Sequence, residues 1–153
     1  MGATIGVELR ALWLQGVGEN HGNNFPHLGL DCWSPNINVV RDPRWGRILE
    51  TSGEDPFLSG RFGAAYTQGL QQASPAEPHG FLQGVATLKH FAAYSLEAYR
   101  DVTRHTFDAV ASPYDLATTY WPAWRNAIVA GGARGVMCSY NEVRPFYLQL
   151  ANH

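Results

Sequence analysis

The sequence WSPNINVVRDPRWGRILETSGED, residues 33–55, joins a strand-like run to a loop rich in charged and aromatic side chains. The run Ile37–Val40 is typical of a strand, and Pro43, which fixes its own φ and lacks an N–H, predicts a turn directly after it. Trp45 and Arg47 follow among several carboxylates. Such a loop is either a structural corner held by ion pairs or a site for a polyhydroxylated ligand. In the second case, guanidinium and carboxylate groups make charge-assisted hydrogen bonds while an indole face packs on the ligand ring.

Helices and strands are predicted to alternate along the chain. Hydrophobic periodicity and breaker residues predict helices over residues 5–14, 56–70 and 113–130, and strands over 30–40, 84–91 and 134–139. Residues 92–111 are expected to be irregular. Strands that alternate with helices of this length imply an α/β fold with a parallel sheet and right-handed crossovers.

Two helix starts carry capping signals. Asp55 before Pro56 is an N-cap followed by a first-turn proline. Ser112 before Pro113, with Asp115 three residues after the serine, predicts a capping box.

The core-facing sides of these helices follow from the spacing of their large apolar side chains. The helix that starts at 113 is expected to bend at Pro122 and to stop at Gly131-Gly132. The residues expected to face a core are Ile5, Leu9, Leu12 and Trp13 in the first helix, and Phe57, Phe62, Ala65, Tyr66 and Leu70 in the second.

Polar side chains follow the end of each predicted strand. Arg47 comes after the first, Lys89 and His90 close the second, and Tyr140 follows the third. A (β/α) barrel builds its active site at this edge of its sheet. Arg47 can present a rigid fork to hydroxyl groups or to a carboxylate. Adjacent side chains alternate sides within a strand, but at its end both Lys89 and His90 can reach one pocket.

Composition excludes several classes of protein. A chain of 153 residues with 45% hydrophobic and 16% charged residues is ordinary for one globular domain. The net charge of −2 argues against a nucleic-acid partner. No apolar run approaches the roughly 20 residues of a membrane helix, and residues 1–13 lack the features of a signal peptide. The sequence itself indicates no compartment.

The cysteines and histidines do not predict a metal site. Cys32 and Cys138 lack metal-type spacing and are expected to be small buried apolar residues in strands. His21 and His27 share a loop near Cys32, but their spacing is irregular. No metal and no cofactor is expected.

Four segments together resemble glycoside hydrolase family 3, the β-glucosidase and β-xylosidase family. In chain order they are SPNINVVRDPRWGR (34–47), ETSGEDPFLSGRFG (50–63), TLKHFAAYSLE (87–97) and GVMCSYNEV (135–143). The resemblance extends over about residues 5–153, and its wording is closest to the fungal and plant β-xylosidase type. It implies that residues 1–153 are the central part of an N-terminal catalytic domain, a partial (β/α)8 TIM-type barrel.

The resemblance also implies a function and a substrate. The full-length parent is expected to hydrolyse β-linked xylosides or glucosides with retention, outside the cell, with no cofactor and with neither nucleic acid nor membrane as partner. The rest of the catalytic domain and a following domain are its expected partners.

The resemblance assigns roles to individual side chains. Arg47, Lys89 and His90 match residues that hydrogen-bond the sugar in the subsite before the scissile bond, and Tyr140 matches a tyrosine that lines this subsite. Arg104, in RHTFDA, matches an arginine of β-xylosidase-type sequences. Trp33 is either a wall on which a sugar stacks or a buried packing residue. Asp42, Glu54 and Asp55 are interpreted as ion-pair partners and caps.

The catalytic residues themselves are not expected in this chain. A retaining glycosidase needs a nucleophilic carboxylate and a second carboxylic acid about 5 Å away. The resemblance places the nucleophile downstream of the SYN motif and the acid/base in a following domain, so we expect residues 1–153 alone to be inactive. After Val143 the sequence departs from the family pattern: Arg144-Pro145 follows at once, and residues 146–148 resemble the next helix as if several residues had been lost.

Three alternatives stay open. The same pocket could serve a non-catalytic sugar-binding module, or the chain could be a truncated, inactive remnant. The third is a β-N-acetylglucosaminidase, a branch that extends its Lys-His-Phe motif with Pro-Gly-His-Gly; here Ala92, Ala93 and Tyr94 follow, which disfavours it.

Overall fold

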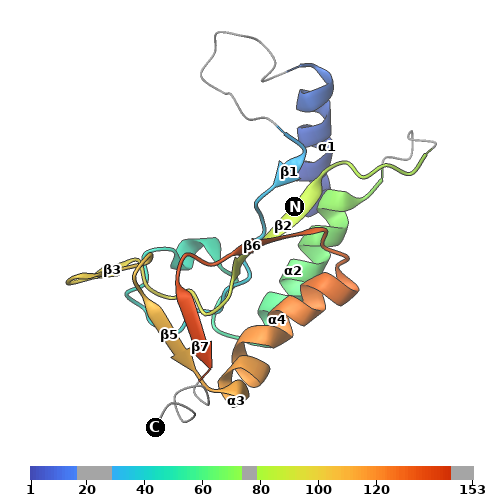
Figure 1. Cartoon of the computed structure of the whole chain (residues 1–153). Coiled ribbons are helices and arrows are strands. Elements are labelled where there is room, and N and C mark those ends of the chain that lie inside the picture. Colours follow the sequence, from blue (N-terminus) through green and yellow to red (C-terminus); the bar gives the residue numbers. More distant parts are fainter. Residues whose placement is uncertain (17–28, 74–78, 146–153) are drawn as a thin grey trace.

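The computed structural model describes residues 1–16, 29–73 and 79–145 (Figure 1). His21, His27 and the predicted helix at 146–148 lie outside the described residues. In the view of Figure 1, α2 and α4 lie on one side of β2 and β6, whereas β3, β5 and β7 lie on the other. No helix among the described residues is both long and apolar enough to cross a membrane.

A parallel three-stranded sheet forms the centre of the fold. Its strands are β1 (Asp31–Cys32), β2 (Val85–Phe91) and β6 (Gly135–Cys138), in the order β1-β2-β6, and both pairs are parallel. The predicted parallel α/β sheet is therefore confirmed. The strand predicted over 30–40 is shorter than expected, because Pro35 cannot donate to a ladder and only an isolated bridge, Asn36 to Lys89, continues the pairing.

The helices begin and end near their predicted bounds. They are α1 (Gly2–Leu14), α2 (Pro56–Gln71) and a continuous helical segment of α3 (Pro113–Asp115), η2 (Leu116–Tyr120), α4 (Trp121–Arg125) and η3 (Asn126–Ala130). A short 3₁₀ helix, η1, spans Ile48–Glu50. The Asp55 side chain accepts a hydrogen bond from the Phe57 N–H at 2.8 Å, and the Ser112 capping box is formed as predicted.

The third helical segment changes its helix type next to Pro122 and ends at Gly131-Gly132, the two positions singled out from the sequence. It changes from π-helical η2 to α-helical α4 directly before Pro122, where a backbone N–H is missing. It ends at Gly131, and Gly132 has a φ of 72°, a conformation that favours glycine.

The faces that the helices bury differ from the prediction at most positions, although Leu70 of α2 is fully buried as predicted. In α2 the buried residues are mostly small, and Phe57 is 71% exposed. A Cβ on Gly63 would lie 2.8 Å from Cγ2 of Ile37, so the small face allows α2 to lie close to the strand-end segment and to α4. In α1 the buried residues are Gly2 and Gly6, not the predicted large ones. The buried faces are therefore set by close packing of the backbone at small residues, which the spacing of large apolar side chains does not reveal.

The segment predicted to be irregular contains three strands. A hairpin pairs β3 (Ala98–Tyr99) with β4 (Val102–Thr103), and β5 (Asp108–Ala111) pairs in parallel with β7 (Glu142–Pro145). The sequence does not show these strands because the first two have only two residues each, and β5 is paired with a segment more than thirty residues away.

One expectation about the cysteines is wrong. Both lie in strands as predicted, Cys32 in β1 and Cys138 in β6. Cys32 is half-buried, but Cys138 is exposed, because the side chains of β6 alternate and its cysteine falls on the exposed side.

Candidate functional site

One carboxylate orders two cations at the end of the central strand. Glu50 accepts hydrogen bonds from Nε of Arg47 at 2.6 Å and from Nη2 of Arg47 at 2.8 Å, and its Oε2 lies 3.2 Å from Nζ of Lys89. These contacts lower the pKa of Glu50 to about 2, with the Arg47 hydrogen bonds as the largest cause. The same pair raises the pKa of Arg47. Glu50 therefore holds both cations in a fixed position beside the strand end.

His90 is fully buried and clamped by Asn38. The Asn38 amide donates to the His90 carbonyl at 2.8 Å, and its Oδ1 accepts from the His90 N–H at 2.9 Å. Because this pattern identifies Oδ1 as the acceptor, the ring Nδ1 at 3.0 Å must be the protonated nitrogen. Burial, followed by Arg47 and Lys89, lowers the pKa of His90 to about 4. At neutral pH, Nε2 is therefore an unprotonated acceptor, buried without a partner among the described residues.

An aromatic group covers the imidazole. The ring of Tyr94 lies 4.8 Å from that of His90, 5.4 Å from Trp45 and 5.5 Å from Tyr140, each in an edge arrangement. Tyr140 lies 5.6 Å from His90. Edge-to-face contacts at these distances are favourable and hold the rings in fixed orientations.

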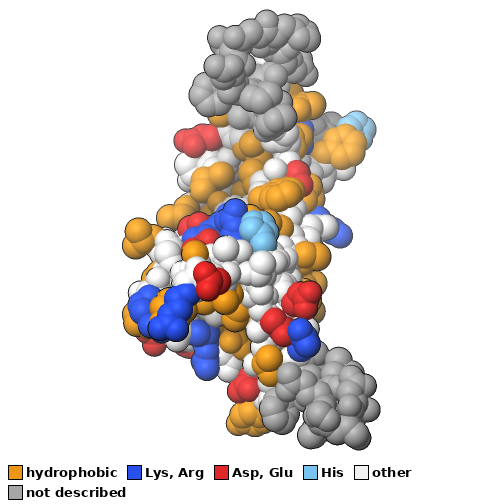
Figure 2. All heavy atoms as spheres, turned by 60° about the vertical axis from the view of Figure 1, so that its left-hand side comes forward, with side chains coloured by type: hydrophobic (Ala, Val, Ile, Leu, Met, Phe, Trp, Pro, Cys, Tyr) orange, Lys and Arg blue, Asp and Glu red, His pale blue; other side chains and the backbone are white. Residues whose placement is uncertain are grey.

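A second carboxylate, Glu97, ties a loop to this aromatic group. Its Oε1 accepts hydrogen bonds from the indole N–H of Trp45 at 3.0 Å and from the hydroxyl of Tyr94 at 2.5 Å. Its Oε2 lies 3.7 Å from Nη1 of Arg104, whose guanidinium lies 4.2 Å from the centroid of the Tyr140 ring. On the face shown in Figure 2, Lys and Arg side chains lie beside Asp and Glu side chains with hydrophobic groups between them.

The side chains of the site form two clusters. The strand-end cluster comprises Asn36, Asn38, Arg47, Glu50, Lys89 and His90, and the hairpin cluster comprises Tyr94, Glu97 and Arg104. Tyr140 contacts both, through His90 and Tyr94 on one side and Arg104 on the other.

The structure thus brings together five of the six predicted binding residues. Arg47, Lys89, His90, Tyr140 and Arg104 meet within the two clusters or between them.

Trp33, the sixth predicted binding residue, stands apart from the clusters. It is 58% exposed, which is against the buried-packing alternative, and its indole N–H donates to Asp31 at 3.1 Å. Among the described residues no ring contact links Trp33 to either cluster. Of the loop carboxylates, Asp42 pairs with Arg44 and Asp55 caps α2, as predicted. The role of Glu54 stays a prediction.

Five residues of this site were not predicted from the sequence. The first is Asn36, whose amide donates to Glu50 at 3.5 Å from 14 residues away. Glu50 was noted only as part of the charged loop, although its position three residues after Arg47 is a usable signal for an ion pair. Asn38, Tyr94 and Glu97 gave no comparable signal, because each acts on residues brought near only by folding or by an irregular loop.

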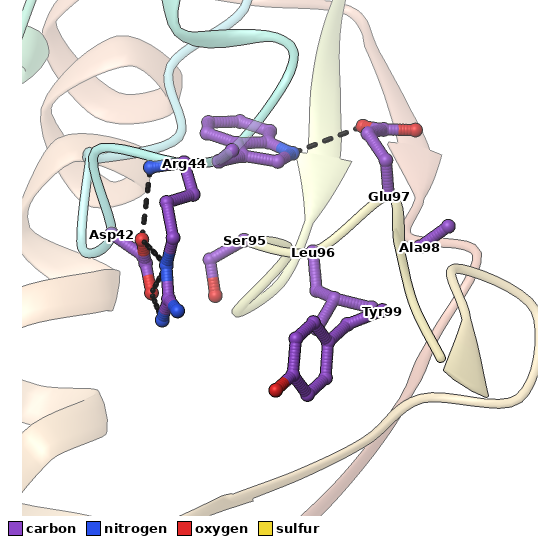
Figure 3. Close-up of a pocket in the computed structure, with 8 residues that line it drawn as sticks. Asp42, Arg44, Ser95, Leu96, Glu97, Ala98 and Tyr99 are labelled. Atoms are coloured by element: carbon purple, nitrogen blue, oxygen red, sulfur yellow. Dashed lines mark hydrogen bonds and ion pairs between the residues drawn. The ribbon is translucent and has the colours of Figure 1, made fainter. Parts of the chain in front are cut away.

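A cavity of about 150 Å³ lies beside the hairpin cluster (Figure 3). Trp45 and Glu97 form part of its wall, and Figure 3 shows the Arg44–Asp42 pair across the opening from Tyr99. No group of His, Cys, Asp and Glu in the described part of the chain could hold a metal ion.

Comparison with known proteins gives a consistent result. The family model "Glycosyl hydrolase family 3 N terminal domain" matches residues 1–147. β-D-xylosidase 3 of Arabidopsis thaliana is 42% identical over 143 residues, which are 94% of this chain and 17% of that protein. A probable exo-1,4-β-xylosidase of Aspergillus clavatus is 48% identical over 121 residues, 78% of this chain and 15% of that protein.

Solved structures show the same similarity. A GH3 exo-β-xylosidase in complex with a xylobiose aziridine activity-based probe aligns with a TM-score of 0.76 at 36% identity, covering 93% of this chain and 17% of that one. A mutant β-glucosidase of Listeria innocua in complex with laminaribiose aligns with a TM-score of 0.61 at 34% identity, covering 93% and 18%.

Proposed function

The chain belongs to glycosyl hydrolase family 3, and we propose that it supplies sugar-binding residues to an enzyme that hydrolyses β-linked xylosides or glucosides. Its α/β fold corresponds to part of a TIM-type barrel. The chain spans 15–17% of the length of the curated relatives it matches, so the activity of a whole protein is inferred from the family. We further propose that residues 1–153 are the central part of the N-terminal barrel domain and that the nucleophile and the acid/base belong to other segments.

The observation that carries this proposal is the unpartnered Nε2 of His90. A buried acceptor without a partner costs about 1–3 kcal/mol, which a ligand that donates a hydrogen bond recovers. A sugar hydroxyl can donate to Nε2 and accept from a neighbouring cation at the same time. Lys89 and Arg47 lie beside His90, and each pairs with Glu50.

The preferred glycon is a xylose unit. Two of the relatives are xylosidases by name, and one similar structure holds a xylobiose-derived probe. In this chain the Arg104 guanidinium packs over the ring of Tyr140, and that ring lies next to His90.

Titration of the purified protein with xylose, followed by NMR chemical shifts, tests the binding role. We expect saturable binding that moves the His90 ring signals, and a dissociation constant about tenfold higher in Arg47→Ala. Arg61→Ala, a matched change on the exposed surface of α2, should bind as the wild type does. Failure of xylose and glucose to bind would overturn the proposal.

Turnover of an aryl β-xyloside tests the catalytic part. The 153-residue chain should show none, whereas the full-length protein, once its transcript has been sequenced through the codon for His153 and beyond, should hydrolyse it. Turnover by the 153-residue chain would overturn the placement of the two catalytic carboxylates elsewhere. Binding without turnover in the full-length protein would instead identify a non-catalytic sugar-binding module.

A further inference from the structure

We infer that Glu97 is a positioning residue that holds Arg104 and Tyr94 against the sugar pocket. This inference rests on the proposed function, since the pocket is the one assigned above. Among the described residues, the hydrogen bonds and the ion pair of the Glu97 carboxylate are with Tyr94, Trp45 and Arg104. Tyr94 packs on the imidazole of His90, and Arg104 packs on Tyr140, which also contacts that imidazole.

The contacts of Glu97 join two segments that are far apart in the sequence. Trp45 belongs to the loop after the first strand and is 4% exposed, whereas Arg104 follows the β3–β4 hairpin. The Glu97 carbonyl accepts a hydrogen bond from the Arg104 N–H at 2.8 Å, so the backbone and the side chain of Glu97 hold the same arginine. The Cγ of Glu97 packs against Gly46, at 3.4 Å from where a Cβ would stand.

Charge makes this arrangement specific for a carboxylate. Arg104 is drawn toward the ring face of Tyr140 by a cation–π contact at 4.2 Å. The Arg47 guanidinium lies 5.8 Å from the centroid of the Tyr94 ring. Tyr94 and Tyr140 contact each other, so this aromatic pair has one guanidinium group on each ring. Glu97 supplies the negative charge on the Arg104 side that Glu50 supplies on the Arg47 side. Without it, Arg104 has no acidic partner among the ion pairs of the described residues.

The hydroxyl of Tyr94 is oriented by the same carboxylate. Because the Tyr94 hydroxyl donates a hydrogen bond to Glu97, the direction of its O–H bond is set and its oxygen can still accept. The pKa of Tyr94 is raised, first by burial and then by the Glu97 hydrogen bond, so the phenol stays protonated at neutral pH. Glu97 therefore fixes both the direction of the phenol and the position of Arg104.

A double-mutant cycle in the full-length protein separates positioning from a general structural role. Glu97→Gln preserves the shape and an acceptor for Trp45 but removes the charge that holds Arg104. We expect KM for an aryl β-xyloside to rise about tenfold in Glu97→Gln while kcat changes little, and Arg104→Ala to have a similar effect. In the Arg104→Ala background, Glu97→Gln should add little further change. An equal rise in KM in both backgrounds would overturn the inference.

A second measurement keeps this test apart from that of the proposed function. If the wild-type protein neither binds nor hydrolyses glycosides, the proposed function fails, yet the Arg104 Nε–H resonance still reports on Glu97. That resonance should shift in Glu97→Gln and stay in place in Glu54→Gln, a matched change at an exposed carboxylate. An unmoved Arg104 resonance in Glu97→Gln would show that Glu97 does not position Arg104.

Discussion

The strand-end cluster and the hairpin cluster use the same chemistry with different support. In each, a carboxylate holds a guanidinium beside an aromatic group. Glu50 grips Arg47 with two hydrogen bonds of 2.6 and 2.8 Å, and the Arg47 and Lys89 side chains are 19% and 20% exposed. Glu97 meets Arg104 at 3.7 Å, and the Arg104 side chain is 37% exposed.

The two clusters differ in the secondary structure that carries them. The strand-end cluster is tied to the sheet, because the Lys89 carbonyl and N–H bond to Ile37 and Pro35, and Asn38 clamps His90. The hairpin cluster stands on a loop whose two strands have two residues each. The same interaction therefore contributes to folding in one place and mainly to the shape of the pocket in the other. Four predictions test this division.

The largest effect is expected from Asn38→Ala. This substitution leaves the buried N–H, carbonyl and ring Nδ1–H of His90 without partners, so the free energy of unfolding should fall by about 3–5 kcal/mol. In the hairpin region, Thr106→Ala removes an exposed acceptor of the Thr103 N–H and should cost less than about 1 kcal/mol. Chemical denaturation measures both. Equal losses would contradict the division.

The second prediction concerns the pH dependence that His90 imposes on stability. Its pKa is about 4 in the folded protein, against about 6.5 when unfolded. Between these values the unfolded state binds a proton that the folded state does not, so stability falls as pH drops from about 6.5 to 4. The loss is at most about 3 kcal/mol.

His90→Gln isolates this contribution, because glutamine does not titrate. Unfolding free energies measured from pH 7 to pH 4 should fall less steeply in this variant than in the wild type. Parallel curves for the two proteins would show that His90 titrates normally.

The third prediction is a smaller effect of Glu50, which has the same sign as that of His90 but occurs at lower pH. The depressed pKa of Glu50 means that its ion pairs stabilise the fold above the ordinary glutamate pKa, and that this contribution is lost as pH falls through about 2. Its side chain is 38% exposed, so solvent screening limits the contribution to about 1 kcal/mol. The stability difference between wild type and Glu50→Gln should therefore be present at pH 7 and shrink below about pH 4.

Glu54→Gln is the control for this measurement, since Glu54 is an exposed carboxylate in the same loop. A pH-independent difference between wild type and Glu50→Gln would argue that the carboxylate acts through packing and not through charge.

The smallest effect on stability is expected from Arg104→Ala. The midpoint of thermal unfolding should stay where it is in the wild type, because the ion pair and the cation–π contact of Arg104 are both partly exposed. Xylose affinity should nevertheless fall. A clear drop in the midpoint, measured by circular dichroism, would place the hairpin cluster among the groups that hold the fold.

Local signals in the sequence predicted much of the architecture. Asp55 before Pro56 and Ser112 before Pro113 predicted two helix starts correctly, because a cap depends on residues within one turn of each other. The strand over 84–91 and its parallel pairing also followed from pattern and order. Apart from Leu70, the buried faces of α1 and α2 did not follow from the pattern, because glycines contribute nothing to a hydrophobic period.

The candidate site divides in the same way. The sequence by itself placed Arg47, Lys89, His90 and Tyr140 at or after the ends of predicted strands, and a parallel sheet brings the ends of its strands to one edge. Only the tertiary structure decided which carboxylate pairs with which cation and which nitrogen of His90 stays open. Asn38 and His90 are 52 residues apart, as are Trp45 and Glu97. Such partners are chosen by the packing of the folded chain, and no period or local spacing encodes them.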